Sequence, residues 1–95
     1  QDMPILADVG LAVARLALAG DDPLVAAAVL GAAARVRGAE DRTSPAVARL
    51  TSELRDRLGE TFAAAYGTGW SLDPGAAIER LDPARLNLVL QARRA

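Results

Sequence analysis

Proline divides this chain into segments of helical length, and this punctuation constrains the fold more than any other feature. Of five prolines, four follow a residue type that caps helices: Asp22, Ser44, Asp73 and Asp82. Proline is tolerated at the first helical position because its missing N–H would have no partner there, and a preceding Asp or Ser accepts a bond from the next turn. The pattern predicts helices at 4–19, 23–37, 45–58, 60–67, 74–81 and 83–93.

Glycines mark the places where these helices are expected to end, since glycine is the usual residue at a helix C-terminus. They are Gly20, Gly38, Gly59, and either Gly67 or Gly69. The connections are short, so we expect consecutive helices to pack as antiparallel neighbours. The polar segment 39–44 is the expected hinge or exposed loop.

Composition predicts an all-α fold in one small domain. The 95 residues include 22 alanines but single copies of Phe, Tyr and Trp. Alanine, leucine and arginine favour helices, whereas the aromatic residues that favour strands are scarce. We expect a single domain over 1–95 of five or six helices, divided into a hairpin at 4–38 and C-terminal helices at 44–95. The chain is interpreted as a fragment of a longer protein.

The missing residue types narrow the chemistry. Cysteine, histidine and lysine are absent. The chain therefore lacks a thiol nucleophile, the usual acid–base group at neutral pH, the commonest metal ligands and a Schiff-base lysine. We expect no enzyme activity, no cofactor and no metal site. The net charge of −1 gives no overall field that would attract nucleic acid. The longest apolar run, residues 24–34, is too short to span a bilayer, and no signal peptide is evident, so a cytoplasmic location is expected.

The segment 45–58 has the clearest amphipathic pattern. Its large apolar residues recur on one helical face: Val47, Leu50, Leu54 and Leu58. Charged residues occupy the other side: Arg49, Glu53, Asp56 and Arg57. They are interpreted as a solvated face on which Glu53 and Arg57 have the favourable i, i+4 order.

The first two helices show broader apolar surfaces. In 4–19 the predicted stripe is Ile5, Val9, Val13 and Leu16, and three leucines lie off it: Leu6, Leu11 and Leu18. In 23–37 the valines Val25, Val29 and Val36 share one side, while Leu24 and Leu30 lie elsewhere. A helix that is apolar most of the way round is covered on more than one side.

The stretch "GDDPLVAAAVLGAAARVRG", residues 20–38, contains six alanines. A glycine inside a helix costs about 1 kcal/mol relative to alanine, so Gly10 and Gly31 favour a close approach where the first two helices cross. We assign a helix-packing signature to small residues and one leucine: Gly10, Ala14, Ala26, Leu30, Gly31 and Ala33. The alternative is that alanine is simply a good helix former in a GC-rich genome.

Two helices joined by "GDDP" carry small residues at Ala14, Ala26 and Ala33 and a large one at Leu30, and residues 20–72 read "GDDPLVAAAVLGAAARVRGAEDRTSPAVARLTSELRDRLGETFAAAYGTGWSL". The first two helices resemble a tetratricopeptide-type hairpin, and residues 5–82 look like the C-terminal region of large actinobacterial transcriptional regulators of the antibiotic-regulatory and LuxR types. Such tails often read "GDP…AA.LLGAA…RG" followed by "P.VARL…R..LG…F.AAYA.G..L". This resemblance implies a helical scaffold or sensor surface, with nucleotide hydrolysis and DNA binding in upstream modules. The chain departs from the pattern at Gly67 and Trp70 and in its last residues, "NLVLQARRA".

Two groups of acidic residues are candidates for a metal site or a catalytic pair. Asp21 and Asp22 form a pair, but Asp22 precedes Pro23 and is interpreted as a helix cap, since an oxygen cage for a metal needs further ligands. Three other carboxylates were considered as a hydrolase pair: Glu53, Asp56 and Glu60. They fall on the polar face of a regular helix, where no apolar pocket is implied.

The residues assigned to partner contact are Tyr66, Trp70 and Leu24, whose large side chains lie near loops; closing the core is the alternative role for the two aromatics. We expect a non-catalytic interaction module that contacts other domains of the same chain or a second copy as a homodimer. Such a piece of a helical stack should expose an apolar end on the 4–37 hairpin. No membrane contact and no direct nucleic-acid contact are expected.

The alternative is a small helical nucleic-acid-binding domain. Six arginines fall within a short stretch, and "LRDRLGETFAAAYGTG" can be interpreted as helix–turn–helix. The six are Arg35, Arg37, Arg42, Arg49, Arg55 and Arg57. Acidic residues alternate with them, and the helix 60–67 offers few side chains able to contact base edges.

Overall fold

The computed structural model describes residues 3–37 and 44–82, together with Ala84, Leu88 and Gln91. Within these residues the regular secondary structure is helical and there is no strand, which confirms the all-α prediction. The helices are α1 (Met3–Ala19), α2 (Pro23–Arg37), α3 (Pro45–Leu58), α4 (Thr61–Trp70) and α5 (Pro74–Arg80). The predicted loop at 39–43 and most of the predicted helix 83–93 lie outside the described residues.

The helix starts follow the predicted capping chemistry. Side-chain oxygens of Asp22, Ser44 and Asp73 each accept a bond from the backbone N–H three residues on, at 3.1, 3.3 and 3.0 Å. Asp82 accepts from the N–H of Ala84 at 2.9 Å. These bonds satisfy N–H groups that have no partner inside the helix.

The helix ends follow the prediction less closely. After α1 the residue with left-handed backbone is Asp21 (φ 62°), not Gly20. The N–H groups of Asp21 and Asp22 bond back to carbonyls of the last turn at 2.9 and 3.0 Å, which is a Schellman motif. Gly59 ends α3 at φ 57°, as predicted.

The predicted end of α4 at Gly67 or Gly69 is wrong, because the helix continues through both glycines to Trp70.

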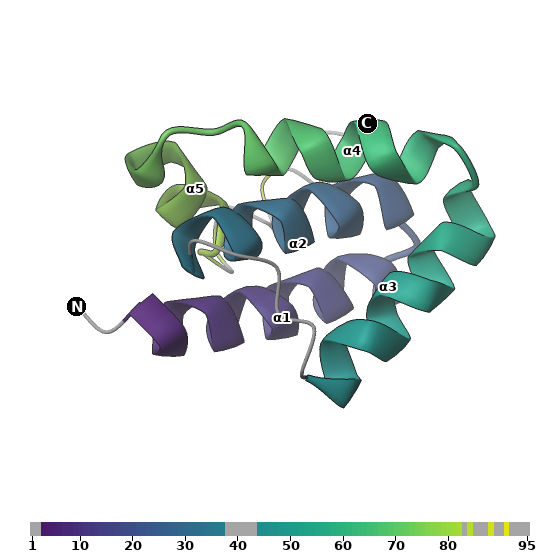
Figure 1. The fold of residues 1–95 in the computed structure, drawn as a ribbon, viewed down its shortest axis with the longest axis horizontal. Helices are drawn as coiled ribbons and strands as arrows, with labels where there is room; N and C mark the ends of the chain where they lie inside the picture. Colours follow the sequence, from purple (N-terminus) through teal and green to yellow (C-terminus); the bar gives the residue numbers. More distant parts are fainter. Residues whose placement is uncertain (1–2, 38–43, 83, 85–87, 89–90, 92–95) are drawn as a thin grey trace.

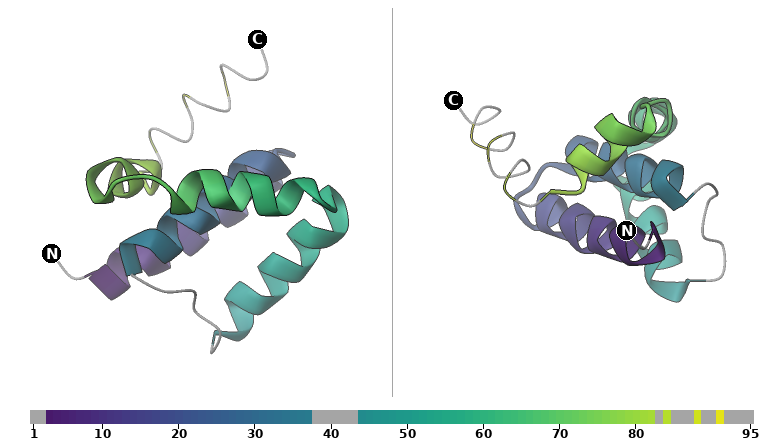
Figure 2. Two further views of the ribbon diagram at one scale, coloured as in Figure 1. Left: turned by 45° about the horizontal axis from the view of Figure 1, so that its top comes forward. Right: turned by 90° about the vertical axis from the view of Figure 1, so that its left-hand side faces the viewer.

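Helix α2 lies at the centre of the fold, with α1 on one side and α4 on another (Figure 1). The α1–α2 pair is the expected antiparallel hairpin. Helix α4, however, runs in the same general direction as α2 (Figures 1 and 2). It packs directly against α2, although α3 lies between the two helices in the sequence. Helix α3 makes far fewer close backbone approaches and lies at a steep angle to the others. The prediction that every consecutive pair packs as antiparallel neighbours is therefore wrong beyond the first pair.

The alanines of α2 allow both α1 and α4 to pack closely against this helix. Nearly every position of the helix from Val25 to Ala34 is buried. A β-carbon on Gly10 of α1 would lie 2.7 Å from the Ala33 Cβ of α2. Gly31 faces α4 rather than α1, where a β-carbon would overlap the Tyr66 carbonyl oxygen. Small side chains thus let two helices approach α2 from different sides.

The orientation of α1 differs from the prediction. Gly10, Ala14 and Ala17 face α2 and are buried, together with Val13. Val9 and Leu16, expected in the core stripe with Val13, are instead exposed. The small side of the helix is buried because only that side permits the close approach to α2. The side chains of Ile5 and Leu6 lie outside the described part.

Helix α3 follows its predicted pattern. Leu50 and Leu54 are buried, and Val47 and Leu58 pack against the core. The four charged residues on the opposite side are exposed, and Arg57 pairs with Glu53 at 3.7 Å. Among the described residues, no helix is both long and apolar enough to cross a lipid bilayer.

Candidate interaction surfaces

An exposed apolar strip runs along α1, and we call it the α1 outer stripe. It consists of Val9, Ala12, Leu16 and Ala19. These positions fall within about 80° of the helix circumference at 100° per residue. Val9 is 38% exposed and Leu16 is 55% exposed. The stripe contains no charged or polar side chain, which distinguishes it from the exposed side of α3.

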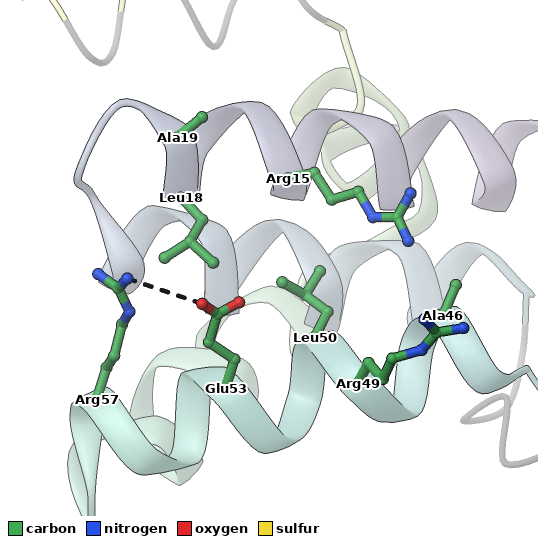
Figure 3. A pocket seen from close by; sticks show the side chains of 8 residues that line it. All are labelled: Arg15, Leu18, Ala19, Ala46, Arg49, Leu50, Glu53 and Arg57. Atoms are coloured by element: carbon green, nitrogen blue, oxygen red, sulfur yellow. Dashed lines mark ion pairs between the residues drawn. The ribbon is translucent and has the colours of Figure 1, made fainter.

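A second feature is an open cleft of about 430 Å³ between α1 and α3, the α1–α3 cleft. Its lining residues are Arg15, Leu18, Ala19, Ala46, Arg49, Leu50, Glu53 and Arg57. Leu18 of α1 and Leu50 of α3 point toward each other between the helices (Figure 3). The cleft exists because α3 is tilted and contacts the core chiefly through its buried leucines.

The charges of the α1–α3 cleft are unevenly balanced. Arg57 lies 3.7 Å from Glu53 and 3.9 Å from Asp21. The guanidinium groups of Arg15 and Arg49 lie toward the opposite end from this ion pair (Figure 3). Arg49 Nε donates to the Pro45 carbonyl at 3.4 Å, within its own helix. Neither Arg15 nor Arg49 makes an ion pair with a described carboxylate, so the described side chains at this end of the cleft have an excess of positive charge.

The three residues predicted for partner contact do not form one surface. Leu24 lies in the first turn of α2 and Trp70 in the last turn of α4, and these turns lie toward opposite ends of the molecule (Figure 1). Leu24 is 41% exposed and Trp70 39% exposed. Tyr66 is half-buried and packs on Phe62, with ring centroids 5.6 Å apart. Any contact through Leu24 would therefore be separate from one through Trp70.

A smaller hollow of about 360 Å³ lies where α3 turns into α4. Phe62 and Tyr66 line it, and the Arg55 guanidinium carbon lies 5.2 Å from the Phe62 ring centroid. This cation–π contact occupies the ring face, so the hollow is already partly used by an internal contact.

The carboxylates considered in the sequence remain dispersed. Asp22 caps α2, while Asp21 is exposed beside Arg57. Within the described part of the chain, no three acidic residues gather in a group able to hold a metal ion. Helix α4, the recognition helix in the nucleic-acid interpretation, packs against α2 at Gly69. Its exposed residues are Thr61, Ala63, Ala64, Thr68 and Trp70.

Sequence reasoning missed Arg15 as a surface residue and placed Leu16 in the core. A signal for the latter was present, since Gly10, Ala14 and Ala17 already form a continuous small-residue face on the same helix. Nothing in the sequence pairs Arg15 with Arg49, because their proximity depends on the angle of α3.

Comparisons with models of protein families, with curated proteins and with solved structures found no match.

Proposed function

We propose that this chain is a non-catalytic protein-interaction module whose α1 outer stripe packs against helices of a neighbouring protein segment. The observation that carries this proposal is the exposure of Leu16, at 55%, within a stripe free of charged and polar side chains. Burial of apolar surface contributes roughly 25 cal/mol per Å². Large contiguous apolar patches on a protein surface mark interaction sites, and the α1 outer stripe is proposed as part of such a patch.

The proposed occupant of the stripe is a helical hairpin stacked beside α1. In helical arrays each hairpin buries its apolar face on the next one. The resemblance of residues 5–82 to the tails of actinobacterial transcriptional regulators supports this arrangement. In that setting the module is the C-terminal domain of a multidomain, cytoplasmic regulator, and tetratricopeptide-like helices precede it.

The regulator-tail proposal is tested by the size of the native product. An antibody raised against this segment is used to immunoblot extracts of the source cells. We expect a band several-fold larger than 9.8 kDa, the mass of this chain. A band near 9.8 kDa would overturn the regulator-tail proposal and leave a free-standing helical adaptor.

The stripe itself is tested on the isolated chain by sedimentation velocity over a range of concentrations. We expect concentration-dependent self-association, because a second copy covers the stripe when no neighbour is present. Leu16→Glu should abolish it, whereas Ala64→Glu, on the exposed side of α4, should not. A strict monomer at high concentration, or association unchanged by Leu16→Glu, would contradict the assignment of this surface.

The alternative proposal is a small nucleic-acid-binding domain. The observation that favours it is the gathering of Arg15, Arg49 and Arg57 around the α1–α3 cleft. Binding through phosphates weakens with salt, with a slope of about −0.9 in log K per phosphate contacted on a logarithmic salt axis. Steeply salt-dependent retention on duplex DNA would support this alternative against the protein-interaction module.

A further inference from the structure

We propose that the α1–α3 cleft binds an acidic amphipathic helix of a protein partner. Apolar side chains of that helix contact Leu18 and Leu50, and its carboxylates bond to Arg15 and Arg49. The inference goes beyond the proposed function, because it concerns a second surface that shares only Ala19 with the α1 outer stripe and does not include Leu16.

The shape of the cleft favours a helix as its occupant. Its volume of about 430 Å³ falls in the range of small-molecule pockets, but its four charged lining residues are all exposed. A small ligand would therefore leave much of its surface in water. A helix laid between α1 and α3 covers both walls at once, as amphipathic helices do in apolar grooves.

The floor of the cleft supplies the apolar contact. Leu50 is buried and Leu18 half-buried, and the two point toward each other across the gap (Figure 3). Ala46 adds a small surface on the α3 wall. A row of apolar side chains at helical spacing can insert between these walls without displacing a charged residue of this chain.

The charges of the cleft select an acidic partner. Arg57 already contacts Glu53 and Asp21, so its charge is largely balanced. Arg15 and Arg49 contact no described carboxylate, and their guanidinium groups lie at the same end of the cleft (Figure 3). A guanidinium bonds a carboxylate through two parallel N–H groups, so two such groups favour acidic residues over basic ones.

Nucleic acid fits these observations less well. Phosphates would satisfy the two arginines, but they would leave the exposed part of the Leu18 side chain in water. Glu53 also lies on the same wall as Arg49 and would face an approaching phosphate chain. The combination of an apolar floor with two cations at one end is matched by a helix that carries both leucines and carboxylates.

The probes for this proposal are two fluorescein-labelled peptides of equal length and equal leucine content. One has glutamates flanking its leucine stripe, and the other has lysines in their place. Binding to the full chain is followed by fluorescence anisotropy. We expect the acidic peptide to bind about ten-fold or more tightly than the basic one, and to weaken as salt is raised.

Substitutions in the chain locate the binding. The double variant Arg15→Gln/Arg49→Gln should weaken binding of the acidic peptide by about ten-fold or more, since both charge-assisted contacts are removed. The matched control is Arg55→Gln, which removes a charge from α3 outside the cleft and should change binding by less than about two-fold. Circular dichroism checks that each variant keeps the helical content of the parent.

Several outcomes would overturn the proposal. One is equal binding of the two peptides, and another is unchanged binding of the acidic peptide by the double variant. A third is no binding of either peptide at a peptide concentration of about 1 mM, since a Kd of that size corresponds to a binding free energy near −4 kcal/mol. Tighter capture of a DNA duplex that the double variant abolishes would assign the arginines to nucleic acid. Leu16→Glu should leave peptide binding intact, so failure at the cleft is separable from failure of the α1 outer stripe.

Discussion

Replacing Gly69 by alanine tests a close contact between α4 and α2. Gly69 lies in the last turn of α4, where α4 crosses α2. A β-carbon there would overlap the Ala28 carbonyl oxygen and lie 2.6 Å from the Ala32 nitrogen. Both obstacles are backbone atoms of a buried helix, so no side-chain rotation can relieve the clash. The two helices must move apart.

The size of the effect follows from two opposing contributions. Forcing extra atoms into a packed site costs typically about 1–3 kcal/mol, and a backbone obstacle places Gly69→Ala toward the upper end. Alanine recovers about 1 kcal/mol over glycine in a helix. The expected net loss is therefore about 2 kcal/mol of unfolding free energy.

Gly67 provides a matched control on the same helix, two residues earlier. A β-carbon at Gly67 would meet nothing within 4 Å. Gly67→Ala should therefore gain about 1 kcal/mol from helix propensity alone. The two substitutions make the same chemical change on the same helix, and the structure gives them opposite signs.

Thermal unfolding followed by circular dichroism at 222 nm provides the assay. In a domain of this size, about 1 kcal/mol shifts Tm by roughly 4–8 °C. Gly69→Ala should therefore lower Tm by about 8–16 °C, whereas Gly67→Ala should raise it by about 4–8 °C. If both variants are stabilised alike, α4 does not approach α2 closely at Gly69 and the reasoning is refuted.

The other predictions concern helix ends and are measured by urea unfolding. Asp21→Gly should raise the unfolding free energy by about 0.5–1 kcal/mol, because glycine adopts left-handed backbone without steric cost, whereas Asp21→Ala should not raise it. The loss of the Asp21–Arg57 contact at 3.9 Å between exposed side chains should matter little. Asp22→Ala should lower the unfolding free energy by about 2 kcal/mol and Asp73→Ala by about 1 kcal/mol, since the Asp22 cap is buried and the Asp73 cap is exposed. Equal losses at the two caps would contradict the role assigned to burial.

The starts of the helices were predictable because capping is local chemistry. Asp22, Ser44 and Asp73 each stand directly before a proline and accept from an N–H three residues on. Neither the partner of the bond nor its geometry depends on distant parts of the chain. The same holds for α3, whose leucines alternate strongly enough with charges to define a single buried face.

The end of α4 was not predictable for the opposite reason. A glycine after an apolar run can end a helix or can permit another backbone to approach. Gly59 does the first and Gly69 the second. The two cases differ only in what lies opposite, and the residue opposite Gly69 is about 40 positions earlier in the chain.

The candidate surfaces could be predicted only in part from the sequence, because they too depend on which side of a helix faces its neighbours. An exposed apolar surface on the first hairpin was expected from four leucines off the main stripes: Leu6, Leu11, Leu18 and Leu24. Leu24 is 41% exposed, whereas Leu11 and Leu18 pack against the core, and the side chain of Leu6 lies outside the described part. Two further exposed residues, Val9 and Leu16, were expected to be buried because large apolar side chains usually mark the buried face. Alanine gives no such signal, since it occurs on buried and exposed faces alike.

The small-residue core and the exposed stripe have one physical origin. Helix α2 is approached closely by both α1 and α4, and each approach requires glycine or alanine on the facing sides. The side of α1 that enters the core is therefore its small side. Its larger apolar residues, Val9 and Leu16, are directed away from α2 and stay 38% and 55% exposed in the described fold. Close packing around α2 thus leaves apolar area of α1 exposed among the described residues, which is the physical basis for proposing that this chain is an interaction module.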